Sequence, residues 1–150
     1  DPRPEVHIRA VHACEALGED ARPLVPPLLD LAEKPPEGSH VQWVAIRALS
    51  GLDPENERLL AVSVKLLLEG KRGGSHHLAL SRGGQPAARV LAGALGDADT
   101  RQKLAILSAL AGLGEDARCV HDDIRKLVDH PDAEVAKRAA RIVEGLEQSR

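Results

Sequence analysis

Apolar residues recur at every third or fourth position through most of the chain, and this spacing is typical of amphipathic α-helices. The stripe in the first such segment consists of Val6, Ala10, Ala13, Cys14 and Leu17. Similar stripes run through residues 41–52, 104–113 and 135–146. Apolar faces of partner helices lie between these segments, at residues 59–68, 87–95 and 120–128. The pattern predicts about nine helices, five of one class with partner helices of a second class between them.

Residues that typically begin or end helices punctuate this pattern. The expected helix starts are Pro26–Pro27, Ser39 with Gln42 as a capping box, Asp53–Pro54, Asp99 and Asp132. The expected helix ends are Gly18, Gly51, Gly96 and Gly114. Pro26–Pro27 cannot lie deep inside a helix, so we expect the helix through Leu31 to begin there.

One hexapeptide shows that the chain is internally repetitive. Residues 17–22, Leu-Gly-Glu-Asp-Ala-Arg, recur as residues 113–118, which lie 96 positions later. That offset equals three periods of about 32 residues, a length found in helical repeat proteins. Residues 70–86 depart from the pattern, because glycine pairs flank a short expected helix at 76–81. We expect an irregular repeat or a loop there, and the least stable part of the chain.

Three segments carry a resemblance to a known family: Asp-Pro-Arg-Pro-Glu-Val at 1–6, Ala-Leu-Gly-Glu-Asp-Ala-Arg-Pro at 16–23, and His-Pro-Asp-Ala-Glu-Val at 130–135. With the alanine-rich helices after each valine, the chain resembles HEAT repeats, including the short bacterial kind related to phycobilin lyase-type repeats. The resemblance implies an all-α fold, a right-handed α-solenoid of about four to five helix pairs. It covers residues 1–150 as one domain. Such arrays usually act as scaffolds or binding modules.

The amino-acid composition argues against several other classes of protein. The chain has 150 residues, a net charge of −3, one Trp and no Phe, Tyr or Met. A β-sandwich needs more aromatic residues, and nucleic-acid binding needs a basic surface or aromatic platforms. No apolar run is long enough to span a membrane. Two cysteines are too few for a disulfide framework. The chain opens without Met and without a signal peptide, so we expect a piece of a longer protein.

The sequence contains few groups of residues that could form a catalytic or metal site. His7, His12 and Cys14 share the first helix, and Cys119 lies two residues before His121. No CxxC or HExxH spacing supports a metal site, and no CxxCH allows a c-type haem. No His-Glu dipeptide occurs, as iron-dependent HEAT hydroxylases would need. We therefore expect no metal, cofactor or catalytic residue.

The glycine-rich segment offers one further candidate. Lys71–Arg72 and His76–His77 stand beside glycines that could bind an anion, and the pair of histidines could bind a metal. A degenerate repeat with a loop is the preferred interpretation.

Aligned repeats place basic residues in register. Arg9 aligns with Arg138, His12 with Arg47 and Arg141, and Ile8 with Trp43 and Lys137. Equivalent positions of stacked repeats form a stripe along the array. We therefore predict a partner-binding stripe of Arg9, His12, Trp43, Arg47, Lys137, Arg138 and Arg141. The partner would be another protein or peptide segment, acidic or extended, and the alternative is an ordinary solvated face.

These observations favour a non-catalytic interaction or scaffold module. A second hypothesis is an accessory domain of a larger bacterial enzyme, such as a sulfatase-like or cytochrome-like parent, with neighbouring domains of that chain as partners. A third is a HEAT-like lyase or nucleic-acid-binding protein.

Overall fold

The computed structural model describes residues 4–37, 40–71 and 73–148, which form helices and turns with no strand in these ranges. The elements are α1 (Pro4–Leu17), the 3₁₀ helix η1 (Gly18–Leu24), α2 (Val25–Glu33), α3 (Val41–Leu52), α4 (Glu57–Leu68), α5 (Gly74–Arg82), α6 (Gly84–Gly93), α7 (Thr100–Leu113), η2 (Gly114–Val120), α8 (His121–Arg125) and α9 (Ala133–Gln148). The expected all-α class is confirmed. No described helix has the length and apolar character needed to cross a bilayer.

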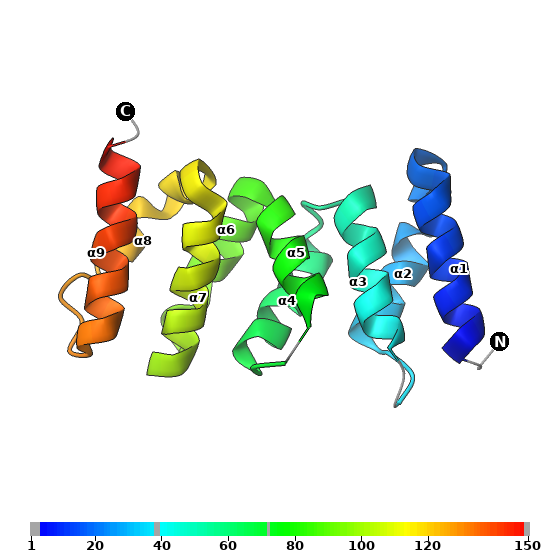
Figure 1. The fold of residues 1–150 in the computed structure, drawn as a ribbon, viewed down its shortest axis with the longest axis horizontal. Helices are drawn as coiled ribbons and strands as arrows, with labels where there is room; N and C mark the ends of the chain where they lie inside the picture. The colour runs from blue at the N-terminus through cyan, green and yellow to red at the C-terminus, as the bar shows by residue number, and fades with distance from the viewer. Residues whose placement is uncertain (1–3, 38–39, 72, 149–150) are drawn as a thin grey trace.

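The helices lie in two rows (Figure 1). Helices α1, α3, α5, α7 and α9 stand side by side in chain order, and α2, α4, α6 and α8 lie behind them. Each odd-numbered helix packs against the next odd-numbered one, and α2, α4, α6 and α8 each pack against the helix that follows them. Two classes of helix therefore alternate along the chain, as the apolar pattern predicts.

Two hydrophobic clusters form the core, and they divide at α4 and α5. We call them the N-terminal cluster, which extends from α1 to α5, and the C-terminal cluster, which extends from α4 to α9. Helix α4 contributes Leu59 to the N-terminal cluster and Leu60 to the C-terminal cluster. Helix α5 likewise contributes Ala79 to the first and Leu80 to the second. These two helices therefore join two separate cores.

The repeated hexapeptide folds identically in both copies. Gly18 and Gly114 adopt left-handed φ values of 56° and 55° and end α1 and α7. Ala21 and Ala117 are fully buried in the 3₁₀ turns that follow. An ion pair of 2.7 Å also forms in each copy, from Arg22 Nε to Glu19 Oε2 and from Arg118 Nη2 to Glu115 Oε2. The sequence repeat is therefore a structural repeat.

Most predicted helix starts are confirmed. Asp99 and Gln102 form the capping box of α7, with hydrogen bonds of 2.8 and 2.9 Å. Asp132 Oδ1 accepts from the first amides of α9, and α2 begins beside Pro26. Asp53 was the wrong residue, because Asn56 caps α4 and its Nδ2 donates to Asp53 Oδ2 at 2.8 Å.

Gln42 has a different role from the predicted one. The expected partner in its capping box, Ser39, lies outside the described residues. Gln42 Nε2 instead donates to the carbonyl of Ala32 at 2.7 Å, near the end of the preceding helix α2. Gln102 makes the equivalent bond of 3.3 Å to Leu68 O at the end of α4. Gln42 therefore ties α3 to the preceding helix α2, and Gln102 ties α7 to α4.

Two predicted helix ends were wrong. Gly51 lies inside α3, and Gly96 lies in a turn after α6 has ended at Gly93. The segment 70–86 is more regular than expected, because α5 covers residues 74–82 and buries Leu80. The predicted stripe of α1 was also wrong in part.

On α1, Val11 and Cys14 are buried, but Val6 and Leu17 are 36% and 54% exposed. The reason is that α1 packs mainly on α3 and η1, so only one side of its apolar stripe is covered.

Alanine substitutions at Gly114 and Gly112 test the left-handed helix end. Gly114→Ala should lower the free energy of unfolding by about 1–2 kcal/mol, because L residues are strained at positive φ. Gly112→Ala, two residues earlier within α7, should be neutral or stabilising by up to about 1 kcal/mol, because an added Cβ there meets open space. Urea denaturation of both variants measures this. Equal changes in the free energy of unfolding of the two variants would contradict the assignment of Gly114 as a left-handed helix end.

Candidate functional site

The predicted partner-binding residues form two groups rather than one continuous stripe. Arg9 and His12 lie on α1, and Trp43 and Arg47 lie on the adjacent α3. The other group, Lys137, Arg138 and Arg141, lies on α9. Helices α5 and α7 separate α3 from α9 (Figure 1). Sequence alignment of the repeats identified equivalent positions, but α7 has Leu104, Ala105 and Ser108 at those positions.

Within the first group, the side chains connect neighbouring helices. Arg47 Nη2 lies 3.3 Å from His12 Nδ1, which links α3 to α1. Trp43 is half-buried, and its ring centroid lies 5.7 Å from that of His76 on α5. A Cβ on Gly73 would lie 3.1 Å from the indole. Trp43 therefore packs between helices, whereas Arg9, His12 and Arg47 are exposed.

Within the second group, Arg138 also links two helices. Its Nη1 donates to Ser108 Oγ of α7 at 2.7 Å, and its Nε lies 2.9 Å from Glu134 Oε1. The hydrogen bond from Arg138 lowers the pKa of Glu134 below its ordinary value. Arg138 is half-buried, whereas Lys137 and Arg141 are exposed. The exposed arginines that occupy the same repeat position are therefore Arg47 and Arg141.

These two arginines line equivalent clefts. The N-terminal cleft has a volume of about 440 Å³ and includes Gly18, Glu19, Arg47, Gly51 and Leu52. The C-terminal cleft has a volume of about 340 Å³ and includes Gly114, Glu115, Arg141, Gly145 and Leu146. Each is formed by the Gly-Glu of the repeated hexapeptide and by an Arg-x-x-x-Gly-Leu segment of an odd-numbered helix. The same cleft thus occurs twice in the described structure.

Glycine within the helix keeps these clefts open. An added Cβ at Gly51 or at Gly145 would meet no atom within 4 Å, so a larger side chain there would project into the cleft. The sequence did not predict these clefts because Gly51 was interpreted as a helix end. The feature that could have indicated them is an Arg four residues before a Gly, which occurs in both 47–52 and 141–146.

The charge of the clefts favours an acidic ligand. The N-terminal cleft contains two guanidinium groups, Arg47 and Arg82, and one carboxylate, Glu19. That carboxylate already lies 2.7 Å from Arg22. In the C-terminal cleft, Glu115 is engaged in the same way by Arg118. The acidic group in each cleft is therefore already paired within its own turn.

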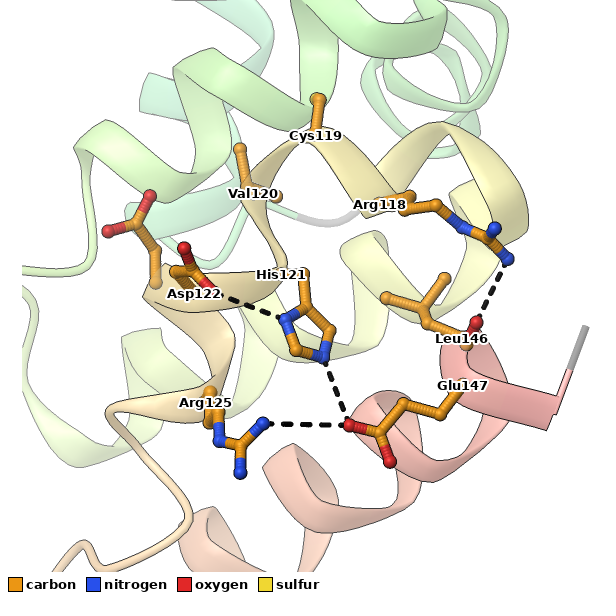
Figure 2. Close-up of a pocket in the computed structure, with 9 residues that line it drawn as sticks. Arg118, Cys119, Val120, His121, Asp122, Arg125, Leu146 and Glu147 are labelled. Carbon is orange, nitrogen blue, oxygen red and sulfur yellow. Dashed lines mark hydrogen bonds and ion pairs between the residues drawn. The ribbon is translucent and has the colours of Figure 1, made fainter. Parts of the chain in front are cut away.

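A larger pocket of about 780 Å³ lies between η2, α8 and the end of α9 (Figure 2). His121 Nδ1 lies 3.3 Å from Asp122 Oδ1, and His121 Nε2 lies 3.5 Å from Glu147 Oε1. Arg125 Nη1 lies 3.7 Å from the same Glu147 oxygen, and Arg118 donates to Leu146 O at 2.9 Å. Basic and acidic side chains pair with one another here, so this pocket contains a network that holds α9 to η2 and α8.

Cys119 and His121 do not form a catalytic pair. In Figure 2 the Cys119 side chain points away from the imidazole. Its Sγ lies 3.3 Å from Asp116 O and 3.8 Å from Gln85 O. Cys14 is buried, as expected, and the side chain of His7 and residue Arg72 lie outside the described structure. Among the described residues, no cluster of three metal-ligating side chains occurs.

Comparison with known protein families, curated proteins and solved structures found no match for this chain. The function is therefore argued from geometry.

The separation of Cys119 from His121 can be tested by alkylation. In a Cys14→Ala background, His121→Ala should leave the dependence of the iodoacetamide reaction rate on pH unchanged, because the imidazole does not touch the thiol. Mass spectrometry of the alkylated peptide measures that rate. A clear fall in the rate near neutral pH would indicate a thiolate–imidazolium pair and contradict this geometry.

Proposed function

We propose that the chain is a non-catalytic protein-interaction module, built as a right-handed α-solenoid of about four to five HEAT-like helix pairs, that binds an acidic segment of a partner. The observation that supports this proposal is the recurrence of one arginine-lined cleft at equivalent repeat positions. Stacked repeats use such positions to build extended binding surfaces. The alternation of two helix classes in Figure 1 supports the architecture.

The chemistry of the clefts defines the ligand. A guanidinium presents a planar fork of N–H donors that matches a carboxylate. Beside Arg47 the N-terminal cleft offers Ala48, Leu52 and Leu78, and beside Arg141 the C-terminal cleft offers Leu110 and Ile142. A short motif with an acidic side chain next to an aliphatic one fits both. Charge-assisted hydrogen bonds would give orientation, and apolar contacts would add affinity.

The separation of the clefts suits an extended segment. Packed helices lie about 10 Å apart, so the steps from α3 through α5 and α7 to α9 span about 30 Å. An extended peptide advances about 3.3 Å per residue, so about nine residues cover that span. One partner segment can therefore reach both clefts.

A second candidate function is an accessory domain that packs on a larger enzyme. The observation that favours it is the exposed apolar surface at one end of the array, where Val6, Leu17 and Leu24 are 36%, 54% and 40% exposed. Another domain that packed on this end would cover these exposed apolar side chains. No described site favours a lyase or a nucleic-acid-binding protein.

Peptide selection tests the first proposal. We expect peptides selected on the wild-type protein from a random display library to be enriched in Asp and Glu beside Leu, Ile or Val. Arg47→Glu with Arg141→Glu should weaken their binding by about tenfold or more, because charge-assisted hydrogen bonds are lost. Fluorescence anisotropy measures the affinity, which should also fall with added salt.

The matched control is Lys34→Glu with Arg89→Glu, which makes the same change in net charge at exposed residues outside both clefts. It should retain binding. Equal losses in the two double variants, or selected peptides without acidic residues, would overturn the proposal.

A further inference from the structure

Helix α5 is a short connection between the two halves of the array. It is only nine residues long, and it packs against α3, α4, α6 and α7. Glycines with left-handed φ flank it, Gly70 at 68° and Gly84 at 52°. Ala79 and Leu80, adjacent on α5, contact different hydrophobic clusters. Movement of α5 would therefore remove one of the two helices that join the cores.

A histidine without a hydrogen-bond partner lies at this junction. His76 is fully buried, and neither of its ring nitrogens has a partner among the described residues. From α3, the uncharged ring of Trp43 faces it at 5.7 Å, and on α5 the ring of His77 lies 4.3 Å away. A buried polar group that makes no hydrogen bond costs about 1–3 kcal/mol. His76 therefore opposes the docking of α5 even in its neutral form.

The surroundings of His76 disfavour its charged form. Burial, and to a smaller extent the charge of the neighbouring His77, lower its pKa to about 4. No carboxylate of α3, α4, α6 or α7 is among the groups that act on it. The charged group that acts on it is His77 of α5 itself, which disfavours a second positive charge. Nothing in this environment compensates a proton on the ring.

We propose that α5 is an acid-sensitive hinge, in which protonation of His76 releases α5 from Trp43 and α3 and uncouples the two halves of the array. A charged imidazole cannot remain buried without a partner, so it must reach solvent. The short helix between glycines provides the means, since the backbone can turn at either end of α5 while α4 still contacts both hydrophobic clusters.

The sign of the effect follows from linkage. Outside the folded core the imidazole titrates near 6.5, and inside it near 4. The form with α5 released therefore binds more protons between these two pH values. The form with α5 docked on α3 loses stability relative to it as the pH falls from about 6.5 to about 4. Above about 6.5 both forms are neutral and the contact between α5 and α3 is fully retained.

The hinge would also control the N-terminal cleft, and this extension rests on the proposed function. Leu78 and Arg82 of α5 line that cleft, whereas no residue of α5 lines the C-terminal one. Release of α5 would dismantle the first cleft and leave the second. Acid would thus convert a protein with two sites into a protein with one.

Trp43 provides a direct readout because it is the only tryptophan in the chain. We expect its fluorescence to change reversibly with a midpoint between about pH 4 and pH 6.5, while helicity measured by circular dichroism is retained. His76→Phe and His76→Gln should each lose this transition, because neither side chain accepts a proton. His77→Gln, the control at the adjacent exposed position, should retain it.

Hydrogen exchange on the same proteins locates the motion. At about pH 5, once exchange rates are corrected for the intrinsic rate of each amide, amides of α5 should exchange at least tenfold faster than those of α7 and α9. His76→Phe should remove this difference. A fluorescence transition that persists in both His76 variants would overturn the hinge. Loss of helicity together with the fluorescence change would overturn it as well. Since peptide binding is not measured, the result is independent of the proposed function.

Discussion

Apolar contact between helices that are neighbours in the sequence is the constraint on which the rest of the structure depends. Each odd-numbered helix packs on the next one, and within the described part of the chain α1 and α9 stand at opposite ends of the row. Small residues make the contact close: Ala45 of α3 and Ala139 of α9 are fully buried. Because every interface is local, equivalent surfaces recur wherever the sequence recurs. The paired clefts are a direct product of that locality.

Local signals predicted most of the fold. The capping residues Asp99 and Asp132, and the glycines that end α1 and α7, act within one turn of the backbone, so their effect can be read from neighbouring residues. The exposed side of α1 could not be predicted in this way. An apolar stripe shows which face favours burial, but only the tertiary arrangement decides whether a neighbour covers it.

The sequence predicted the arginines of the candidate site, but it did not predict the clefts that they line. Repeat alignment identified Arg47 and Arg141 as equivalent, and both line a cleft. Alignment could not show that Trp43 and Arg138 contact neighbouring helices, because those contacts depend on the spacing between repeats. Nor could it reveal the buried position of His76, since a histidine beside glycines is typical of an exposed loop.

The identical turns that follow α1 and α7 have a consequence for the history of the gene. Residues 17–22 and 113–118 match in sequence and in backbone conformation, so a crossover between them changes no residue at the junction. Removal of residues 18–113 would connect α1 to the turn that now follows α7, with the same left-handed glycine and the same Glu–Arg ion pair. Duplication by the same route would lengthen the chain by the same unit. Arrays of different lengths can thus arise by recombination without a new turn having to evolve.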